Sequence, residues 1–137
     1  MPLGLLLGQN TYLNIPIFQG CEKFENNKAE SSKCFSEKFT QAISDNINSD
    51  LLNQIYWNNG KKVVNIKIKF RVNKNGIIEE VQSIGESGIE LFQQVLIAIQ
   101  KINQNYSIKP AQIGNEPSNF NFQIPIVYNV PKKPKKK

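Results

Sequence analysis

The sequence predicts a two-layer α+β sandwich, in which two helices cover one face of an antiparallel three-stranded sheet in the order α-β-β-α-β. Three features indicate this fold. Residues 63–81 alternate between apolar and polar side chains around a turn sequence, residues 120–130 alternate in the same way, and an apolar stripe with helical spacing lies on each side of the first alternating segment. A chain of 137 residues is long enough for one domain with a modest core.

The first helix is expected over residues 32–47. Ser32 can cap its first turn, because a serine hydroxyl accepts hydrogen bonds from the free N–H groups at a helix start. The apolar residues that follow recur at helical spacing: Phe35, Phe39, Ala42, Ile43 and Ile47. Leu51, Leu52 and Ile55 add a short further turn, until Asn-Asn-Gly at residues 58–60 ends the helical segment.

A β-hairpin is expected next. The apolar residues of its first strand share one side of a period-2 backbone: Val64, Ile66, Ile68, Phe70 and Val72. The polar residues between them, Asn65, Lys67, Lys69 and Arg71, fall on the other side. The sequence Asn-Lys-Asn-Gly at residues 73–76 can adopt the positive φ angles of a tight turn, and the apolar pattern resumes at Ile77.

The second helix follows the hairpin. Ser87 and Glu90 have the spacing of a capping box, in which the two side chains satisfy free N–H groups at the helix start. The predicted core-facing stripe consists of Phe92, Val95, Leu96, Ile99 and Ile102. Beyond it, Pro110 and Pro117 bracket residues 111–116, which we expect to form a loop because this segment can be neither helix nor central strand.

The last strand is expected over residues 120–130, with its inward side chains packed against the stripe of the second helix. Those inward residues are Phe120, Phe122, Ile124, Ile126, Tyr128 and Val130. Pro125 has no N–H to donate, so this strand should lie at a bulge or at the edge of the sheet.

The net charge of +6 is concentrated in one short segment. Five of the six charges come from lysines within residues 131–137, which leaves the rest of the chain near +1. This segment lacks the apolar residues needed to pack, so we expect a solvated, disordered tail. The nearly neutral body argues against nucleic acid as a partner.

Residues 1–15 are expected to form an arm that precedes the domain. Residues 1–9 are similar to the end of a signal-peptide apolar region, although they equally suit a strand that adds to the core. If the chain is exported, Cys21 and Cys34 meet an oxidising compartment, and a disulfide across their thirteen-residue separation would contribute about 3 kcal/mol. Otherwise they are two buried, inert thiols.

The residue inventory argues against catalysis. The chain has no histidine, so Ser-His-Asp and Cys-His mechanisms and histidine-ligated metal sites are excluded, and two cysteines cannot complete a four-cysteine zinc site. No glycine pattern matches a phosphate-binding or dinucleotide-binding loop. Glu79 and Glu80 are adjacent on a strand, where neighbouring side chains point to opposite faces. We therefore expect no catalytic residues, metal, cofactor or small-molecule substrate.

A combination of short segments, spread from residue 16 to residue 130, carries a resemblance to a known family. The segments are Pro16-Ile17-Phe18-Gln19-Gly20-Cys21-Glu22, Cys34-Phe35, Asn48-Ser49-Asp50-Leu51, Asn73-Lys74-Asn75-Gly76-Ile77-Ile78, Ile108-Lys109-Pro110 and Ile124-Pro125-Ile126-Val127-Tyr128. Together they resemble the C-terminal domain of TonB energy transducers, in the form common in Bacteroidetes. The chain departs from that pattern at Gln19, where proline is usual, and at Ala111, where glycine is usual.

The resemblance implies a periplasmic domain, over residues 16–130, that binds an extended segment of an outer-membrane TonB-dependent receptor. An edge strand can bind such a segment by strand addition, because its unpaired N–H and C=O groups are free. The residues expected to do so are Phe120, Asn121, Phe122, Gln123, Ile124, Ile126, Val127, Tyr128 and Asn129. The alternative is a structural or assembly module that dimerises through the same edge.

A full transducer of this family also has a transmembrane helix and a proline-rich spacer. This sequence contains neither. We therefore expect an excised domain, the product of a mis-assigned start, or a free-standing periplasmic member that binds without transmitting force.

Overall fold

The computed structural model of the protein describes residues 12–85 and 87–135. The expectations for residues 1–11 lie outside this part of the chain. The elements, in chain order, are β1 (Ile17–Phe18), the 3₁₀ helix η3 (Glu22–Phe24), α1 (Lys28–Asp45), α2 (Ser49–Asn58), β2 (Val63–Val72), β3 (Ile78–Ile84), α3 (Ile89–Asn105), β4 (Ile108–Lys109), β5 (Ala111–Ile113), β6 (Glu116–Ser118) and β7 (Phe120–Asn129). The fold is thus α+β, as the sequence predicts.

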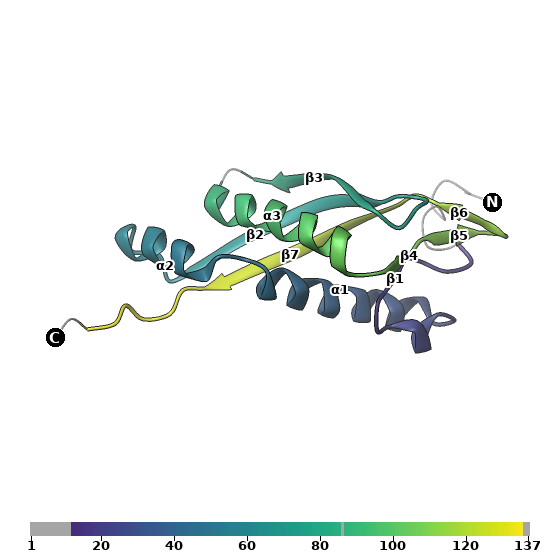
Figure 1. The fold of residues 1–137 in the computed structure, drawn as a ribbon, viewed down its shortest axis with the longest axis horizontal. Coiled ribbons are helices and arrows are strands. Elements are labelled where there is room, and N and C mark those ends of the chain that lie inside the picture. Colours follow the sequence, from purple (N-terminus) through teal and green to yellow (C-terminus); the bar gives the residue numbers. More distant parts are fainter. Residues whose placement is uncertain (1–11, 86, 136–137) are drawn as a thin grey trace, which may run out of the picture.

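The main sheet is antiparallel, with the strand order β3-β2-β7 (Figure 1). Its alternating residues separate cleanly, since every second side chain of β2 and of β7 is buried, apart from the half-buried Tyr128, and those between are largely exposed. β2 is therefore the central strand and β7 lies at an edge, as expected from Pro125. β2 and β7 pair without a register shift from Val63–Asn129 to Val72–Phe120.

Four stacked phenylalanines join α1 to the sheet. The ring centroids of Phe35 and Phe122 are 4.3 Å apart, those of Phe39 and Phe70 are 4.9 Å apart, and those of Phe70 and Phe122 are 5.4 Å apart. α1 thus covers the inward ring of Phe122 on β7. Our expectation that the stripe of the second helix packs against this strand omitted α1, whose aromatic rings lie against Phe122.

Among the residues that the structure describes there are three α-helices, where we expected two. α1 begins at Lys28, four residues before Ser32, because the side chain of Asn27 accepts the N–H of Glu30 at 3.1 Å and caps the helix there. Asn48 likewise accepts the N–H of Leu51 at 3.0 Å, so α2 begins anew instead of extending α1. The order of the main helices and strands along the chain is therefore α-α-β-β-α-β, and the remaining elements are short strands and a 3₁₀ helix.

The start of α3 differs from the expected capping box. Its N-cap is Gly88, with φ of 72°, and a glycine has no side chain that could accept a hydrogen bond from the first turn. The hydroxyl of Tyr56, on α2, instead accepts the N–H of Leu91 at 3.0 Å. A β-carbon on Gly88 would lie 2.5 Å from Ile66, so close packing on β2 requires glycine here.

The buried face of α3 is also rotated relative to the stripe we expected. Leu96 is 38% exposed and Phe92 is half-buried, although both were assigned to the core. Leu91 and Ala98 are fully buried instead, beside Val95, Ile99 and Ile102. The apolar sequence wraps most of the way around this helix, so periodicity alone does not fix its inward face.

Residues 111–118 form a small β-ribbon where we expected a loop. β5 and β6 pair antiparallel through Ala111–Ser118, Gln112–Pro117 and Ile113–Glu116, apart from the main sheet. Pro117 is compatible with this ribbon because a two-stranded ribbon leaves one side of each strand unpaired. A second ribbon pairs β1 with β4, and Asn14 forms a bridge to Gln112.

The predicted hairpin is confirmed, and its second strand contains a bulge. Gly76, with φ of 77°, donates its N–H to the carbonyl of Asn73 at 2.9 Å and completes the turn. The pairing register of β2 with β3 shifts between Lys69 and Arg71. Glu80 lies opposite this shift with φ of 53°, a conformation that non-glycine residues seldom adopt.

Cys21 and Cys34 form a disulfide that ties the segment after β1 to α1. Both residues are buried, and Phe18 and Phe35 pack edge to face beside them with centroids 5.5 Å apart. None of the helices within residues 12–85 and 87–135 is long and apolar enough to cross a membrane.

Reduction of this disulfide should lower the free energy of unfolding by about 2–4 kcal/mol, because the bond restricts the unfolded chain across a thirteen-residue separation. Urea unfolding of the full chain, with and without a reductant, measures the difference. The Cys21→Ala/Cys34→Ala variant provides the control, since its midpoint should not respond to reductant. Equal midpoints for the oxidised and reduced protein would contradict the prediction.

Candidate functional site

The free edge of β7 is the first feature of the candidate site. Val130 donates its N–H to the carbonyl of Lys62 at 2.9 Å, and these two residues extend the register in which Val63 pairs with Asn129. In an antiparallel ladder, hydrogen-bonded and non-hydrogen-bonded pairs alternate. The even-numbered residues of β7 therefore bond to β2, while the odd-numbered residues direct their N–H and C=O groups away from it.

The residues that the sequence assigned to partner binding thus divide into two sets. Phe120, Phe122, Ile124 and Ile126 have buried side chains and backbone groups that pair with β2. Tyr128 is half-buried, and its hydroxyl bonds to Asn53 on α2. The backbone of the other set faces outward, and its members are Asn121, Gln123, Val127 and Asn129. Only this second set can extend the sheet.

Pro125 lies in the middle of the outward set. It lies opposite Lys67 and belongs to the odd-numbered residues, whose backbone groups point away from β2. Its missing N–H therefore falls on the open edge, and the β2–β7 ladder loses no hydrogen bond. The strand can therefore remain regular through Pro125. The open edge has a carbonyl but no donor at this one position.

A groove of about 270 Å³ runs between the edge of β7 and α1. Pro125, Ile126, Val127 and Tyr128 form one wall. The α1 side supplies Thr40, Ile43 and Ser44, with Ile47 just after the helix and Leu91 from α3. The sequence identified Ile126, Val127 and Tyr128 but not the helical side of this groove, because nothing in the spacing of Ile43 and Ile47 indicates that α1 lies beside this edge.

The opposite edge of the sheet, at β3, is partly closed. Ile78 pairs with Val72, whose backbone bonds to β7, so the N–H and C=O of Ile78 point away from β2. The carboxamide of Asn103, on α3, bonds to both of these groups at 3.0 Å. The bulge at Glu80 interrupts the same edge further along. Backbone groups that already have hydrogen-bond partners hinder the addition of a strand, and so do bulges.

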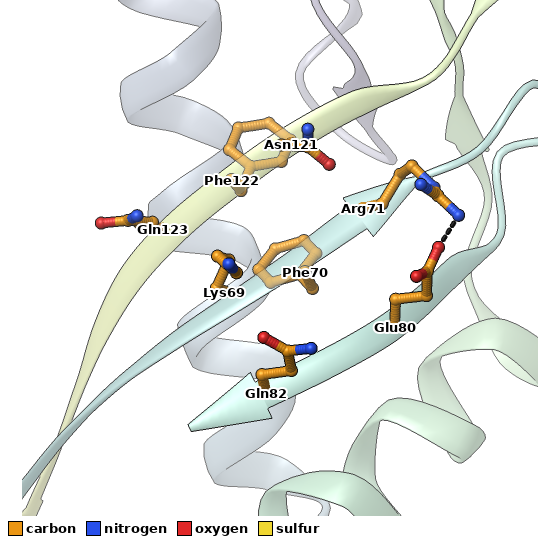
Figure 2. Close-up of a pocket in the computed structure, with 8 residues that line it drawn as sticks. All are labelled: Lys69, Phe70, Arg71, Glu80, Gln82, Asn121, Phe122 and Gln123. Atoms are coloured by element: carbon orange, nitrogen blue, oxygen red, sulfur yellow. Dashed lines mark ion pairs between the residues drawn. The ribbon is translucent and has the colours of Figure 1, made fainter. Parts of the chain in front are cut away.

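The face of the sheet opposite the helices carries a polar groove of about 460 Å³ (Figure 2). Lys69 points into it between the amide groups of Gln82 and Gln123. Arg71 forms ion pairs with Glu79, at 2.9 Å, and with Glu80. The remaining lining residues are Phe70, Asn121 and Phe122. The polar side chains of this lining can form hydrogen bonds with a ligand. The lining residues include no nucleophile paired with a base.

Glu79 is the carboxylate of this face with the most hydrogen-bond donors. Asn73 donates to it at 2.8 Å and the Nε of Arg71 at 2.9 Å. The hydrogen bond from Asn73, followed by that from Arg71, lowers the pKa of Glu79. In the part of the chain that the structure describes, no three Cys, Asp or Glu side chains gather closely enough to hold a metal ion.

Comparison of the chain with protein-family models, curated proteins and solved structures finds no match.

Arg71→Gln should raise the pKa of Glu79 toward its usual value, because two donors are lost. A carboxylate whose pKa is lowered by folding contributes stability above its unfolded-state pKa of about 4.3, and this contribution is lost as the pH falls through the folded-state pKa. The wild-type protein should therefore lose more stability than the variant on acidification below about pH 4. Carbon-13 titration of the Glu79 carboxyl group and urea unfolding at several pH values measure the two effects.

Lys69→Gln is the matched control, since it removes a neighbouring cation of the same face and leaves both Arg71 ion pairs in place. An identical Glu79 titration in the wild type and in Arg71→Gln would contradict the assigned cause.

Proposed function

We propose that this chain is a non-catalytic binding domain similar to the C-terminal domain of TonB energy transducers. It binds an extended segment of an outer-membrane TonB-dependent receptor, which adds as a strand along β7. The observation that carries the proposal is the regular, outward backbone of β7 beside the α1 groove. Strand addition satisfies such a backbone and lets alternate side chains of the peptide determine specificity.

The backbone and the side chains of the added peptide meet different parts of the domain. Its backbone bonds to the outward groups of Asn121, Gln123, Val127 and Asn129, and donates to the carbonyl of Pro125. Side chains on the helix side enter the groove, where Ile43 and Ile47 offer apolar contact. A peptide with an apolar residue at that position should bind best. Because a single added strand must also be ordered, the affinity is expected to be on the order of micromolar.

A periplasmic location is part of the proposal. The Cys21–Cys34 disulfide supports it, because disulfides persist in oxidising compartments such as the periplasm and are rare in the cytosol. The order of helix, hairpin, helix and final edge strand supports the resemblance to the TonB domain.

The second candidate is a module that dimerises through the same edge. The exposure of Val127, at 56%, favours it, because apolar side chains at a free edge promote pairing with a second copy. Pro125 counts against it, since two copies paired here would lack donors near the centre of the edge. Solution mass measured over a range of concentrations, without peptide, distinguishes the two.

Val127→Pro should weaken peptide binding strongly while leaving the β2–β7 ladder intact, because the N–H of Val127 points to the open edge. Calorimetric titration of the full chain with extended peptides from the periplasmic end of candidate receptors measures the affinity. Val127→Ala is the control, since it shortens the same side chain and keeps the N–H. If both variants bind like the wild type, the peptide does not add to this edge.

Pro125→Val should have the opposite effect. It supplies the missing donor at the open edge with a residue suited to strands, and one added hydrogen bond of about 0.5–1.5 kcal/mol corresponds to about twofold to tenfold tighter binding. The same titration measures the gain. Unchanged or weaker affinity of a correctly folded Pro125→Val protein would contradict pairing along residues 121–129.

A further inference from the structure

Four lysines gather where α2 and the end of β7 meet. Lys61 and Lys62 lie between α2 and β2, and Lys132 and Lys133 follow β7 in the chain. All four are exposed, and together they line a cavity of about 350 Å³ that also includes Trp57. We call these four lysines and Trp57 the basic cluster.

Hydrogen bonds hold both halves of the basic cluster in position. Gly60, with φ of 69°, ends α2, and the N–H of Lys61 bonds back to the carbonyl of Tyr56 at 2.9 Å in the manner of a Schellman motif. On the other side, Trp57 Nε1 donates to the carbonyl of Pro131 at 2.6 Å. This bond holds Pro131 beside α2, and the next two residues, Lys132 and Lys133, line the same cavity as Lys61 and Lys62.

The charge of the basic cluster is not balanced within the domain. No ion pair between residues that the structure describes reaches any of its four lysines. Lys135, Lys136 and Lys137 follow in the sequence and add further positive charge. Like charges held together repel one another, and an external polyanion relieves this repulsion.

We propose that the basic cluster docks the domain onto an anionic lipid surface. Apolar groups lie among the lysines, namely Trp57, Val130 and Pro131. Lysines around a tryptophan are a combination suited to the headgroup region, where the ammonium groups meet lipid phosphates and the indole enters the interface. Nucleic acid would be contacted mainly through the same charges, without a role for these apolar neighbours.

The position of the basic cluster fits a flat partner. α2 and the segment after β7 lie together at one end of the long axis, opposite the β5–β6 ribbon (Figure 1). A membrane can reach such an end without obstruction. The open edge of β7 runs along the length of the molecule, so docking at this end leaves most of that edge accessible. Lipid docking is therefore independent of the proposed peptide binding.

The test uses the full chain and large vesicles of equal parts phosphatidylglycerol and phosphatidylcholine, with pure phosphatidylcholine vesicles for comparison. Trp57 is the only tryptophan of the chain, so intrinsic fluorescence reports directly on the basic cluster. We expect binding to the anionic vesicles alone, at low salt, with a shift of the emission to shorter wavelength. Co-sedimentation gives the affinity.

Lys61→Gln/Lys62→Gln should weaken vesicle binding by about tenfold or more, since each lysine near an anionic surface contributes about fivefold. Lys67→Gln/Lys69→Gln is the matched control: it removes the same charge from the open face of the sheet and should change the affinity by less than about twofold. Peptide titration of Lys61→Gln/Lys62→Gln should remain like that of the wild type.

Three results would overturn the proposal. Equal loss of vesicle binding in the two double variants would show attraction to net charge alone. Vesicle binding without a change in Trp57 emission would show that the terminal lysines act without the basic cluster. Tighter binding of a DNA duplex, with the same emission change, would identify nucleic acid as the occupant.

Discussion

The stack of Phe35, Phe39, Phe70 and Phe122 fixes the relation between α1 and the sheet, and the candidate site depends on that relation. Its rings come from α1, β2 and β7, so the stack packs this helix against the inner face of both strands. The disulfide at Cys34, next to Phe35, anchors the same part of α1 to the segment after β1. Because α1 packs against the inner face and no strand within residues 12–85 and 87–135 pairs with the outer edge of β7, the groove and the outward backbone lie side by side.

The two edges of the sheet differ in how they are protected against pairing with another strand. The β3 edge is blunted by the Glu80 bulge and by the Asn103 carboxamide, which bonds to both outward groups of Ile78. The β7 edge is regular over ten residues and protected mainly by Pro125. A proline that removes one donor without disturbing the ladder limits pairing with other chains, yet leaves most of the edge able to bind a peptide.

The features that the sequence predicted correctly are those set by local pattern. Alternation in residues 63–72 and 120–129 specified both long strands, the glycine at position 76 specified the turn, and Pro125 specified the edge. Each of these depends on neighbouring residues only, and such signals can be interpreted without a tertiary structure.

The features that were missed depend on contacts between distant segments. Asn27 caps α1 from a polar stretch that is equally typical of a loop, and Tyr56 replaces the expected serine cap of α3 from another helix. The position of α1 beside β7 depends on the fit of aromatic rings, and so the α1 wall of the groove could not be predicted from spacing. The bulge at Glu80 was also missed, because glutamate gives no sequence signal for a positive φ.

Amide hydrogen exchange along β7, with and without a receptor-derived extended peptide, tests strand addition most directly. In the free protein, the amides of Ile124 and Ile126 should exchange slowly because they bond to β2, whereas those of Gln123 and Val127 should exchange rapidly. Saturating peptide should slow Gln123 and Val127 and leave the even-numbered amides unchanged. Rapid exchange of Gln123 and Val127 in the peptide-saturated protein would contradict the account.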